Sequence, residues 1–394
     1  PAVISSPSPA PVVALAVQGF KDLDRVLPLL RRLHPCGTAS DRADNRKFFA
    51  DHYAALLLLY FFNPVLTSRN ALLQASQLAK VQAFCGGRPV SAGSFSEAQH
   101  LFDPALLEGL VTELAGRVPD AKVPEDWEGL KKLTAVDGSL LPALPRMVWA
   151  LWLDDEHKAA KMHVHFEVLR GIPVKATVTT GNDSEKQQLR QTLEAGRLYV
   201  IDRGYAEYQL FQDILDGGSQ FLGRIRDNAV WEVVEERPVS AAAGMAGVRS
   251  DRVVWLGGEQ SGQALQQPVR VLEVATGKVD SRGRPEVLLL ATSCLEMAAE
   301  LVALAYKFRW EEELFFRWFK CVLGRRHLVS ESLDGVTVQV YVALIANLLL
   351  TIWAGKKPTK RTFEMFCLCF MGWATEEELQ HHLEQLKDQK GNSS

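Results

Sequence analysis

The stretch YKFRWEEELFFRWFK, residues 306–320, combines three consecutive glutamates with tryptophan, phenylalanine, arginine and lysine. Neither glycine nor proline interrupts the chain from Glu296 to Leu323, which predicts one continuous helix. At about 100° per residue, four polar side chains of that helix share a strip about 60° wide. These four are Tyr306, Arg309, Glu313 and Lys320.

The same helical wheel separates the three glutamates. Glu311 lies at the edge of the apolar face and Glu312 on the flank, so the pattern singles out Glu313. Glu311 and Glu312 are expected to point away from any site that Glu313 joins. The alternative interpretation is a solvated polar strip with ion pairs between residues four apart. A tyrosine and two flanking tryptophans are unusual in such a strip, which favours a functional site.

The composition is that of an ordinary globular protein, with 394 residues, 47% hydrophobic and 23% charged. The net charge of −3 means that any nucleic acid must be bound by local basic patches. The cysteines lack metal-binding spacing, so reduced core thiols are expected. They are Cys36, Cys85, Cys294, Cys321, Cys367 and Cys369.

The hydrophobic periodicity changes several times along the chain and predicts an α/β protein with several parts. A flexible Pro/Ser/Ala-rich leader (1–20) precedes a helical, DNA-binding domain (21–125). Alternating strands and helices (126–227) and a later helical segment (294–355) form a second domain, and a β-rich insertion (228–293) lies between them. A basic linker with a C-terminal helix and tail (356–394) follows.

Two aspartates are each expected to end an apolar strand. Asp137 follows LTAV, and Asp202 follows RLYVI. Strand ends are where α/β sheets place ligand-binding groups, although either aspartate alone could simply cap a turn. With Glu313 from a helix laid across the sheet, they would form a cluster of carboxylates, which Mg²⁺ and Mn²⁺ prefer as ligands. Two such ions can activate water or a 3′ hydroxyl and stabilise the leaving oxygen of a phosphodiester.

The spacing Tyr306, two residues, Arg309, three residues, Glu313, six residues, Lys320 resembles the Tyr-Arg-Glu-Lys signature of the insertion sequence 4 family of DDE transposases. The order of VDGS, IDRGY, a strand-rich stretch and the glutamate helix matches that family over roughly residues 130–350. The resemblance implies an RNase H-like core, a mixed sheet flanked by helices, with a β-strand insertion. It also implies cut-and-paste transposition through a hairpin intermediate, using two Mg²⁺ or Mn²⁺ ions.

By this resemblance, Asp137, Asp202 and Glu313 would bind the metal ions. Tyr306, Arg309 and Lys320 would hold the DNA backbone, and Trp310 would stack on a flipped base. Basic residues outside the signature are further candidates for phosphate contacts. They are Arg325, Arg326, Lys356 and Lys357.

The expected partners are transposon-end DNA and target DNA, bound by a homodimer in the synaptic complex. The runs YAALLLLYFF and YVALIANLLLTIW are shorter than a bilayer span, so buried helices and no membrane partner are expected. The expected location is the bacterial cytoplasm, at the nucleoid.

Three other functions fit parts of the pattern. An RNase H-like nuclease or resolvase would use the same carboxylates, but such enzymes are usually compact, and the long insertion argues against it. A domesticated transposase that only binds DNA would tolerate the loss of a carboxylate, and the sequence retains all three. A scaffold of helices and strands that binds no DNA is the third alternative.

Overall fold

The computed structural model describes residues 27–35 and 45–388, apart from 84, 145, 153, 155–156, 258–264, 280–282 and 325–327. For residues 321–324 and 386–388 it describes the backbone. The expected leader at 1–20 and the candidate DNA ligands Arg325 and Arg326 therefore lie outside the described residues.

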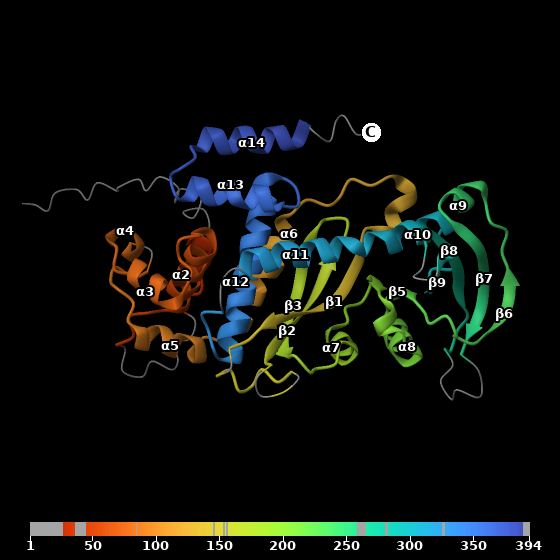
Figure 1. Cartoon of the computed structure of the whole chain (residues 1–394), viewed down its shortest axis with the longest axis horizontal. Helices are drawn as coiled ribbons and strands as arrows, with labels where there is room; N and C mark the ends of the chain where they lie inside the picture. The colour runs from red at the N-terminus through yellow and green to blue at the C-terminus, as the bar shows by residue number, and fades with distance from the viewer. Residues whose placement is uncertain are drawn as a thin grey trace, which may run out of the picture.

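A single mixed sheet of nine strands runs through the middle of the molecule, with strand order β3-β2-β1-β4-β5-β9-β8-β7-β6 (Figure 1). Its first five strands are β1 (Leu133–Pro142), β2 (Ala159–Glu167), β3 (Ile172–Thr180), β4 (Leu198–Ile201) and β5 (Gln220–Arg224). β1, β2 and β3 pair antiparallel, whereas β4 pairs parallel with both β1 and β5. This arrangement, with helices on the sheet, is the RNase H-like α/β core expected from the sequence.

The β-rich insertion extends this sheet and does not form a separate one. Its strands are β6 (Trp231–Glu236), β7 (Val248–Leu256), β8 (Val269–Val279) and β9 (Pro285–Thr292), with the short helix α9 (Ala241–Met245). Consecutive strands pair antiparallel, and β9 continues the ladder onto β5. Pairing of Leu222, Gly223 and Arg224 with β9 gives β5 a second partner strand. The insertion is thereby built onto the edge of the catalytic sheet (Figure 1).

The helices of the catalytic part pack on the sheet. They are α7 (Glu185–Thr192), α8 (Tyr208–Asp216), α10 (Ala299–Phe308), α11 (Trp310–Gly324) and α12 (Leu333–Ala354). Short 3₁₀ helices lie before β1 (Glu125–Leu130) and after β4 (Arg203–Tyr205). α11 contacts β1, and α12 contacts β3.

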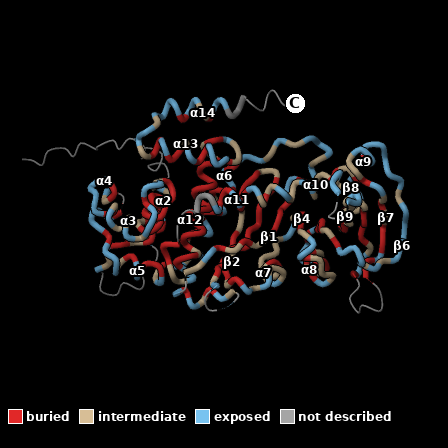
Figure 2. Tube along the Cα trace, in the orientation of Figure 1, coloured by how far each residue is buried: buried red, intermediate tan, exposed pale blue. Residues whose placement is uncertain are grey.

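Helix α12 is the apolar centre of the molecule. Ser332 caps its start by accepting a hydrogen bond from the Gly335 amide, and Gly355 ends it with φ 67°. Its 22 residues are long and apolar enough to cross a membrane, contrary to the shorter span expected, but 89% of its most apolar window is buried inside the protein. Figure 2 shows this helix in red, as expected for the core helix of a globular protein.

The N-terminal helices α2 (Ala50–Phe62), α3 (Arg69–Ala75), α4 (Ala79–Gln82) and α5 (Ala92–Leu101) lie on the other side of α12 from the insertion (Figure 1), whereas α6 (Ala105–Arg117) packs against both α12 and β3. They share one hydrophobic core with α12 and the first strands. The Tyr53 hydroxyl lies 2.7 Å from Ser330 Oγ, and Gln99 accepts from the Glu331 amide at 2.6 Å. Their predicted role in DNA binding stays a prediction.

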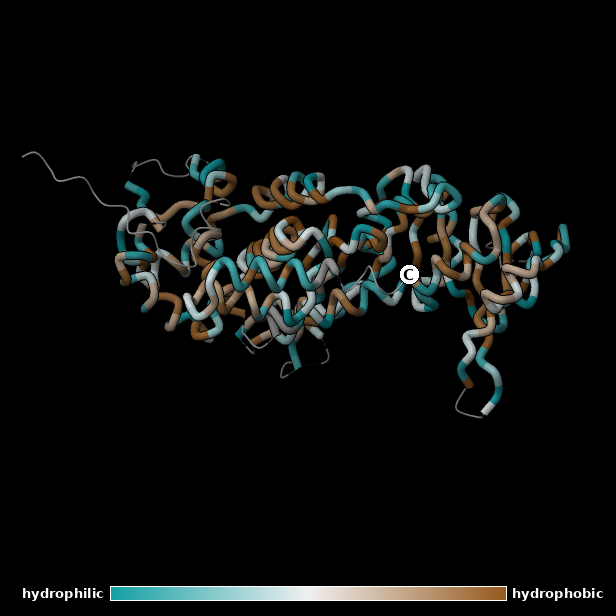
Figure 3. Tube along the Cα trace, turned by 90° about the horizontal axis from the view of Figure 1, so that it is seen from above, coloured by the Kyte–Doolittle hydropathy of each residue, from teal (hydrophilic) through white to brown (hydrophobic). Residues whose placement is uncertain are grey.

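The C-terminal helices α13 (Lys360–Phe370) and α14 (Glu376–Asp388) cover one edge of these helices and complete an elongated molecule (Figures 1 and 3). A capping box between Thr375 and Glu378 opens α14. The four described cysteines, Cys85, Cys294, Cys367 and Cys369, are buried, as the sequence predicts.

Two histidines of β2 are buried in neutral form. His163 Nε2 lies 2.9 Å from Thr179 Oγ1, and His165 Nε2 lies 3.0 Å from Thr192 Oγ1. Burial lowers the pKa of His163 to about 4 and that of His165 to about 3. At a pH between those pKa values and the pKa near 6.5 of an unfolded histidine, the unfolded chain binds protons that the folded chain does not. These histidines therefore make the protein less stable as the pH falls below about 6.5.

We expect His165→Gln to reduce this pH dependence, because glutamine does not titrate. Each such histidine contributes up to about 1.4 kcal/mol per pH unit to the slope, and Asp137, whose pKa is raised, contributes in the opposite direction. The measurement is the free energy of unfolding in urea from pH 7.5 to pH 5, with His381→Gln on the exposed face of α14 as control. An unchanged slope in His165→Gln would contradict a neutral, buried His165.

Candidate active site

The pairing register of two parallel strands places Asp137 beside Asp202. Leu133, Thr134 and Ala135 of β1 pair with Leu198, Tyr199 and Val200 of β4. Two residues further along each strand, the same register reaches Asp137 and Asp202. β1 itself continues past Asp137 to Pro142, contrary to the expectation that this aspartate ends the strand.

Asp137 is held in a partly buried, negatively charged setting. Its Oδ1 accepts a hydrogen bond from the Gly138 amide at 2.8 Å. Burial raises its pKa to about 6, against the effect of this hydrogen bond, and the charges of Glu185 and Asp202 raise it further. Gly138 leaves room for Glu185, because a Cβ at position 138 would lie 2.6 Å from Glu185 Oε1.

Asp202 follows β4 directly and caps the short 3₁₀ helix after it. Its Oδ1 accepts a hydrogen bond from the Gly204 amide at 2.7 Å. In the same helix, the Tyr205 hydroxyl is buried and has no hydrogen-bond partner among the described residues. Asp137, Glu185, Glu312 and Asp202 are its charged neighbours, so it faces the carboxylates.

The three glutamates of α11 point in three directions. The Glu311 carboxylate accepts a hydrogen bond from Lys357 Nζ at 2.8 Å, away from the aspartates. The Glu313 carboxylate lies 3.4 Å from Arg309 Nη2, and a third of its side chain is exposed. Glu312 is fully buried, and Asp137, Arg309 and Asp202 are the charged groups that act on it most strongly. The expectation that Glu312 points away from the aspartates is therefore wrong.

A break in the expected helix explains this difference. α10 ends at Phe308 and α11 begins at Trp310, and the amides of Arg309 and Glu312 each donate to the carbonyl three residues earlier. Such bonds belong to 3₁₀ geometry, with three residues per turn. Tyr306, Arg309 and Glu312 then fall on one line, whereas the wheel of a continuous α-helix had aligned Tyr306 with Glu313.

Burial raises the pKa of Glu312 well above its usual range, and the negative charge of Asp137 adds to this effect. Neither oxygen of Glu312 has a hydrogen-bond partner in the described part of the chain. Arg309, whose guanidinium lies over the Tyr306 ring at 5.8 Å, is the positive group nearest to these carboxylates. Its Nε also lacks a hydrogen-bond partner among the described residues.

A pocket of about 320 Å³ adjoins Tyr306 and Arg309, between α10 and strands β5, β8 and β9. Its basic lining comes from Arg224, Lys278, Lys307 and Arg309, and Trp310 completes one wall. Sequence reasoning missed Arg224. Ile201 pairs with Gly223, so Arg224 stands in register with Asp202 at the end of the next parallel strand. No local pattern marks Arg224, because its place depends on the pairing of β5 with β4.

The other candidate DNA ligands lie in two different places on the molecule. Half of Trp310 is exposed, and the Arg317 guanidinium lies over its ring at 5.7 Å. Lys320 is exposed. Lys357 is engaged with Glu311, whereas Lys356 lines a separate groove together with Lys122 and Arg170.

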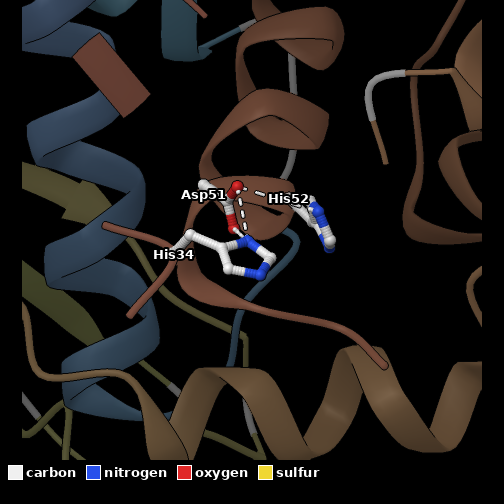
Figure 4. Close-up of side chains that lie close together, drawn as sticks. All are labelled: His34, Asp51 and His52. Carbon is white, nitrogen blue, oxygen red and sulfur yellow. Dashed lines mark hydrogen bonds and ion pairs between the residues drawn. The ribbon is translucent and has the colours of Figure 1, made fainter. Parts of the chain in front are cut away.

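A second cluster of polar side chains lies at the start of α2, across α12 from the sheet (Figures 1 and 4). His34 Nδ1 lies 3.0 Å from Asp51 Oδ2, and His52 Nε2 lies 3.7 Å from the same oxygen. The three ligand atoms lie within 4.8 Å of one another, close enough to hold a metal ion. Asp51 has both histidines as partners. Through His34, the cluster also attaches residues 27–35 to α2.

The residues around Asp137 and Asp202 fit a divalent cation. Carboxylate oxygens dominate the cluster, as hard cations such as Mg²⁺ and Mn²⁺ require. The buried oxygens of Glu312 and the Tyr205 hydroxyl have no hydrogen-bond partner among the described residues. They are therefore available to bind a cation inside the cluster. A cation there would also offset the repulsion among the neighbouring carboxylates.

Comparison with known proteins places this chain in a family. The family described as "Transposase DDE domain" matches residues 128–349, which include both aspartates and the three glutamates. The chain belongs to this family. Its recognition from the sequence as a DDE transposase is therefore confirmed.

Named relatives agree with this assignment. A transposase named y4zB of Sinorhizobium fredii is 28% identical over 58% of this chain and 62% of its own. A transposase for insertion sequence element IS5377 of Geobacillus stearothermophilus is 26% identical over 59% of each chain. The chain thus spans about three fifths of the length of these relatives.

A structural likeness is weaker. The piggyBac transposase synaptic complex with hairpin DNA overlaps 98% of this chain and 87% of that one, at 10% identity and a TM-score of 0.44. Because the TM-score lies below 0.5, this likeness supports no conclusion about the present chain.

Proposed function

We propose that this DDE transposase acts on an insertion sequence, cutting the ends of the element and joining them to target DNA by metal-dependent phosphoryl transfer. The observation that supports it best is the strand register that brings Asp137 beside Asp202, under a helix that carries the family's glutamate signature. The chemistry requires this arrangement, because divalent ions must be fixed at the scissile phosphate by groups on rigid elements.

In this proposal Asp137, Asp202 and Glu313 hold two Mg²⁺ or Mn²⁺ ions. When bound, such ions activate the attacking water or 3′ hydroxyl and stabilise the leaving oxygen. Glu313 is supported by its place in the signature and by its contact with Arg309, which is itself a charged neighbour of Asp202. The rigid sheet fixes the two aspartates, and the packing of α11 on β1 fixes the glutamate.

The neighbouring basic groups would bind the DNA backbone beside the metal site. Arg309 and Tyr306 lie beside Asp202, and Arg224 stands in register with Asp202 on the neighbouring strand. Guanidinium groups match phosphate geometry, and each contact releases counterions from the DNA. Exposed Lys320 would add a contact further along α11.

The proposed partners are transposon-end DNA and target DNA, with two copies of the chain in the synaptic complex. We also propose a hairpin intermediate, in which the aromatic face of Trp310 supports a base flipped out of the end. The exposure of Trp310 and its place in the wall of the pocket beside Arg309 support this role.

Removing any one metal ligand should abolish cleavage while leaving end binding nearly unchanged, since binding rests on phosphate contacts elsewhere. The variants are Asp137→Asn, Asp202→Asn and Glu313→Gln, with Glu311→Gln as the matched control. Each would be assayed for cleavage of a labelled transposon end in Mg²⁺ and for binding by gel shift. Cleavage at the parental rate in any of the three would contradict this mechanism.

Trp310→Ala should leave first-strand nicking intact and slow hairpin formation or opening. Loss of one stacked base costs about 1–3 kcal/mol, roughly a ten- to hundred-fold decrease in rate. A gel-resolved time course would separate nicked, hairpin and double-strand-break products, with exposed Trp373→Ala as control. Equal slowing of nicking and all later steps would instead identify Trp310 as a packing residue.

A further inference from the structure

The buried face of α11 contains an acidic side chain where an apolar one is expected. Phe315, Phe316 and Phe319 of this face pack into the core with at most 6% of their surface exposed. Glu312, one helical turn earlier on the same face, is 0% exposed. Burying a charged carboxylate is costly unless a hydrogen bond or an opposite charge compensates it.

The other buried acids in the described part of the chain have positive or histidine partners. Asp251 is bound by both ends of the Arg270 guanidinium, Glu167 by Arg170 and Arg197, and Asp51 by His34 and His52. The two oxygens of Glu312, by contrast, have no hydrogen-bond partner among the described residues. Glu312 is therefore the buried acid in this part of the protein that lacks a compensating group.

The surroundings of Glu312 indicate what kind of group would compensate it. Asp137, Asp202 and Glu313 are its acidic neighbours, and Arg309 is its positive neighbour. Tyr205 is 1% exposed, its hydroxyl has no partner among the described residues, and Asp137 and Asp202 are among its charged neighbours too. Two buried polar groups without partners in the described part of the chain thus have Asp137 and Asp202 as common charged neighbours. A small divalent cation has the charge and the ligand preference for such a setting.

We propose that Glu312 is a further carboxylate ligand of the active-site metal, binding from the buried side of α11. This inference rests on the proposed metal-dependent function and goes beyond it, because the Tyr-Arg-Glu-Lys signature assigns Glu313 and leaves Glu312 without a role. Both glutamates then serve the site: Glu313 from the accessible rim, where it contacts Arg309, and Glu312 from beneath.

The alternative is that Glu312 is a protonated acid buried by chance, with no role in metal binding. The two ideas predict different results for Glu312→Gln, which keeps the shape of the side chain and removes its charge. Both predict a metal-free protein that is at least as stable as the parent, because an uncompensated buried acid is removed. Only the ligand role predicts weaker metal binding.

The test is calorimetric titration of the full chain with Mn²⁺, without DNA, for the parent and four variants. Glu312→Gln and Asp137→Asn should each weaken Mn²⁺ binding by about ten-fold or more. Glu311→Gln, whose carboxylate binds Lys357, should bind Mn²⁺ within about two-fold of the parent. Glu312→Leu serves as a second variant at this position, and thermal unfolding in EDTA verifies that each variant is folded.

The outcomes separate this inference from the proposed function. If Glu312→Gln and Glu312→Leu bind Mn²⁺ as Glu311→Gln does while Asp137→Asn is weakened, the ligand role of Glu312 is wrong and the metal site stands. If Asp137→Asn also binds Mn²⁺ like the parent, the proposed metal-dependent function is wrong as well.

Discussion

The parallel pairing of β1 with β4 is the constraint on which the active site depends. Its register fixes Asp137 and Asp202 side by side, and the backbone amides of Gly138 and Gly204 hold one oxygen of each. Two like charges so placed repel each other, and burial raises the pKa of Asp137 to about 6. The sheet tolerates this arrangement because strands on both sides of β1 and β4 hold their backbones in place.

The rest of the structure supports this pair. α11 lies on β1 and brings its glutamates to the aspartates. Its aromatic face anchors it, with the Phe315 ring tilted against the ring of Phe166 in β2 at 5.0 Å between centroids. The insertion adds four strands to the sheet edge beyond β5 and forms one wall of the pocket next to Arg309. Buried Arg270 joins the insertion to the segment before α10 by donating to the Leu295 and Met297 carbonyls. The insertion therefore helps to position the helix that carries Tyr306.

Much of this could be predicted from the sequence because the signals are local. Short apolar runs indicated the strands that lead to Asp137 and Asp202, and the spacing from Tyr306 to Lys320 indicated the family. Other features depend on interactions between distant segments and carry no local signal. The joining of β9 to β5, which makes one sheet of nine strands, is such a feature. The role of Arg224 likewise emerges only when β5 is placed beside β4.

The direction of the glutamates shows most clearly where sequence reasoning fails. A wheel at a constant 100° per residue assumes an unbroken α-helix, whereas the backbone tightens at Arg309. The tighter bonds from the Arg309 and Glu312 amides move Glu312 toward the line of Tyr306 and Arg309. Neither glycine nor proline marks this change, so it could not be predicted from residue types.

The central claim is that Asp137 and Asp202 bind a divalent metal together with glutamate from α11. The most direct measurement is the anomalous scattering of Mn²⁺ in crystals of the protein grown with this ion. The account predicts a peak at about 2.0–2.6 Å from oxygens of both Asp137 and Asp202. Mn²⁺ found at His34, Asp51 and His52, with none at the two aspartates, would contradict it.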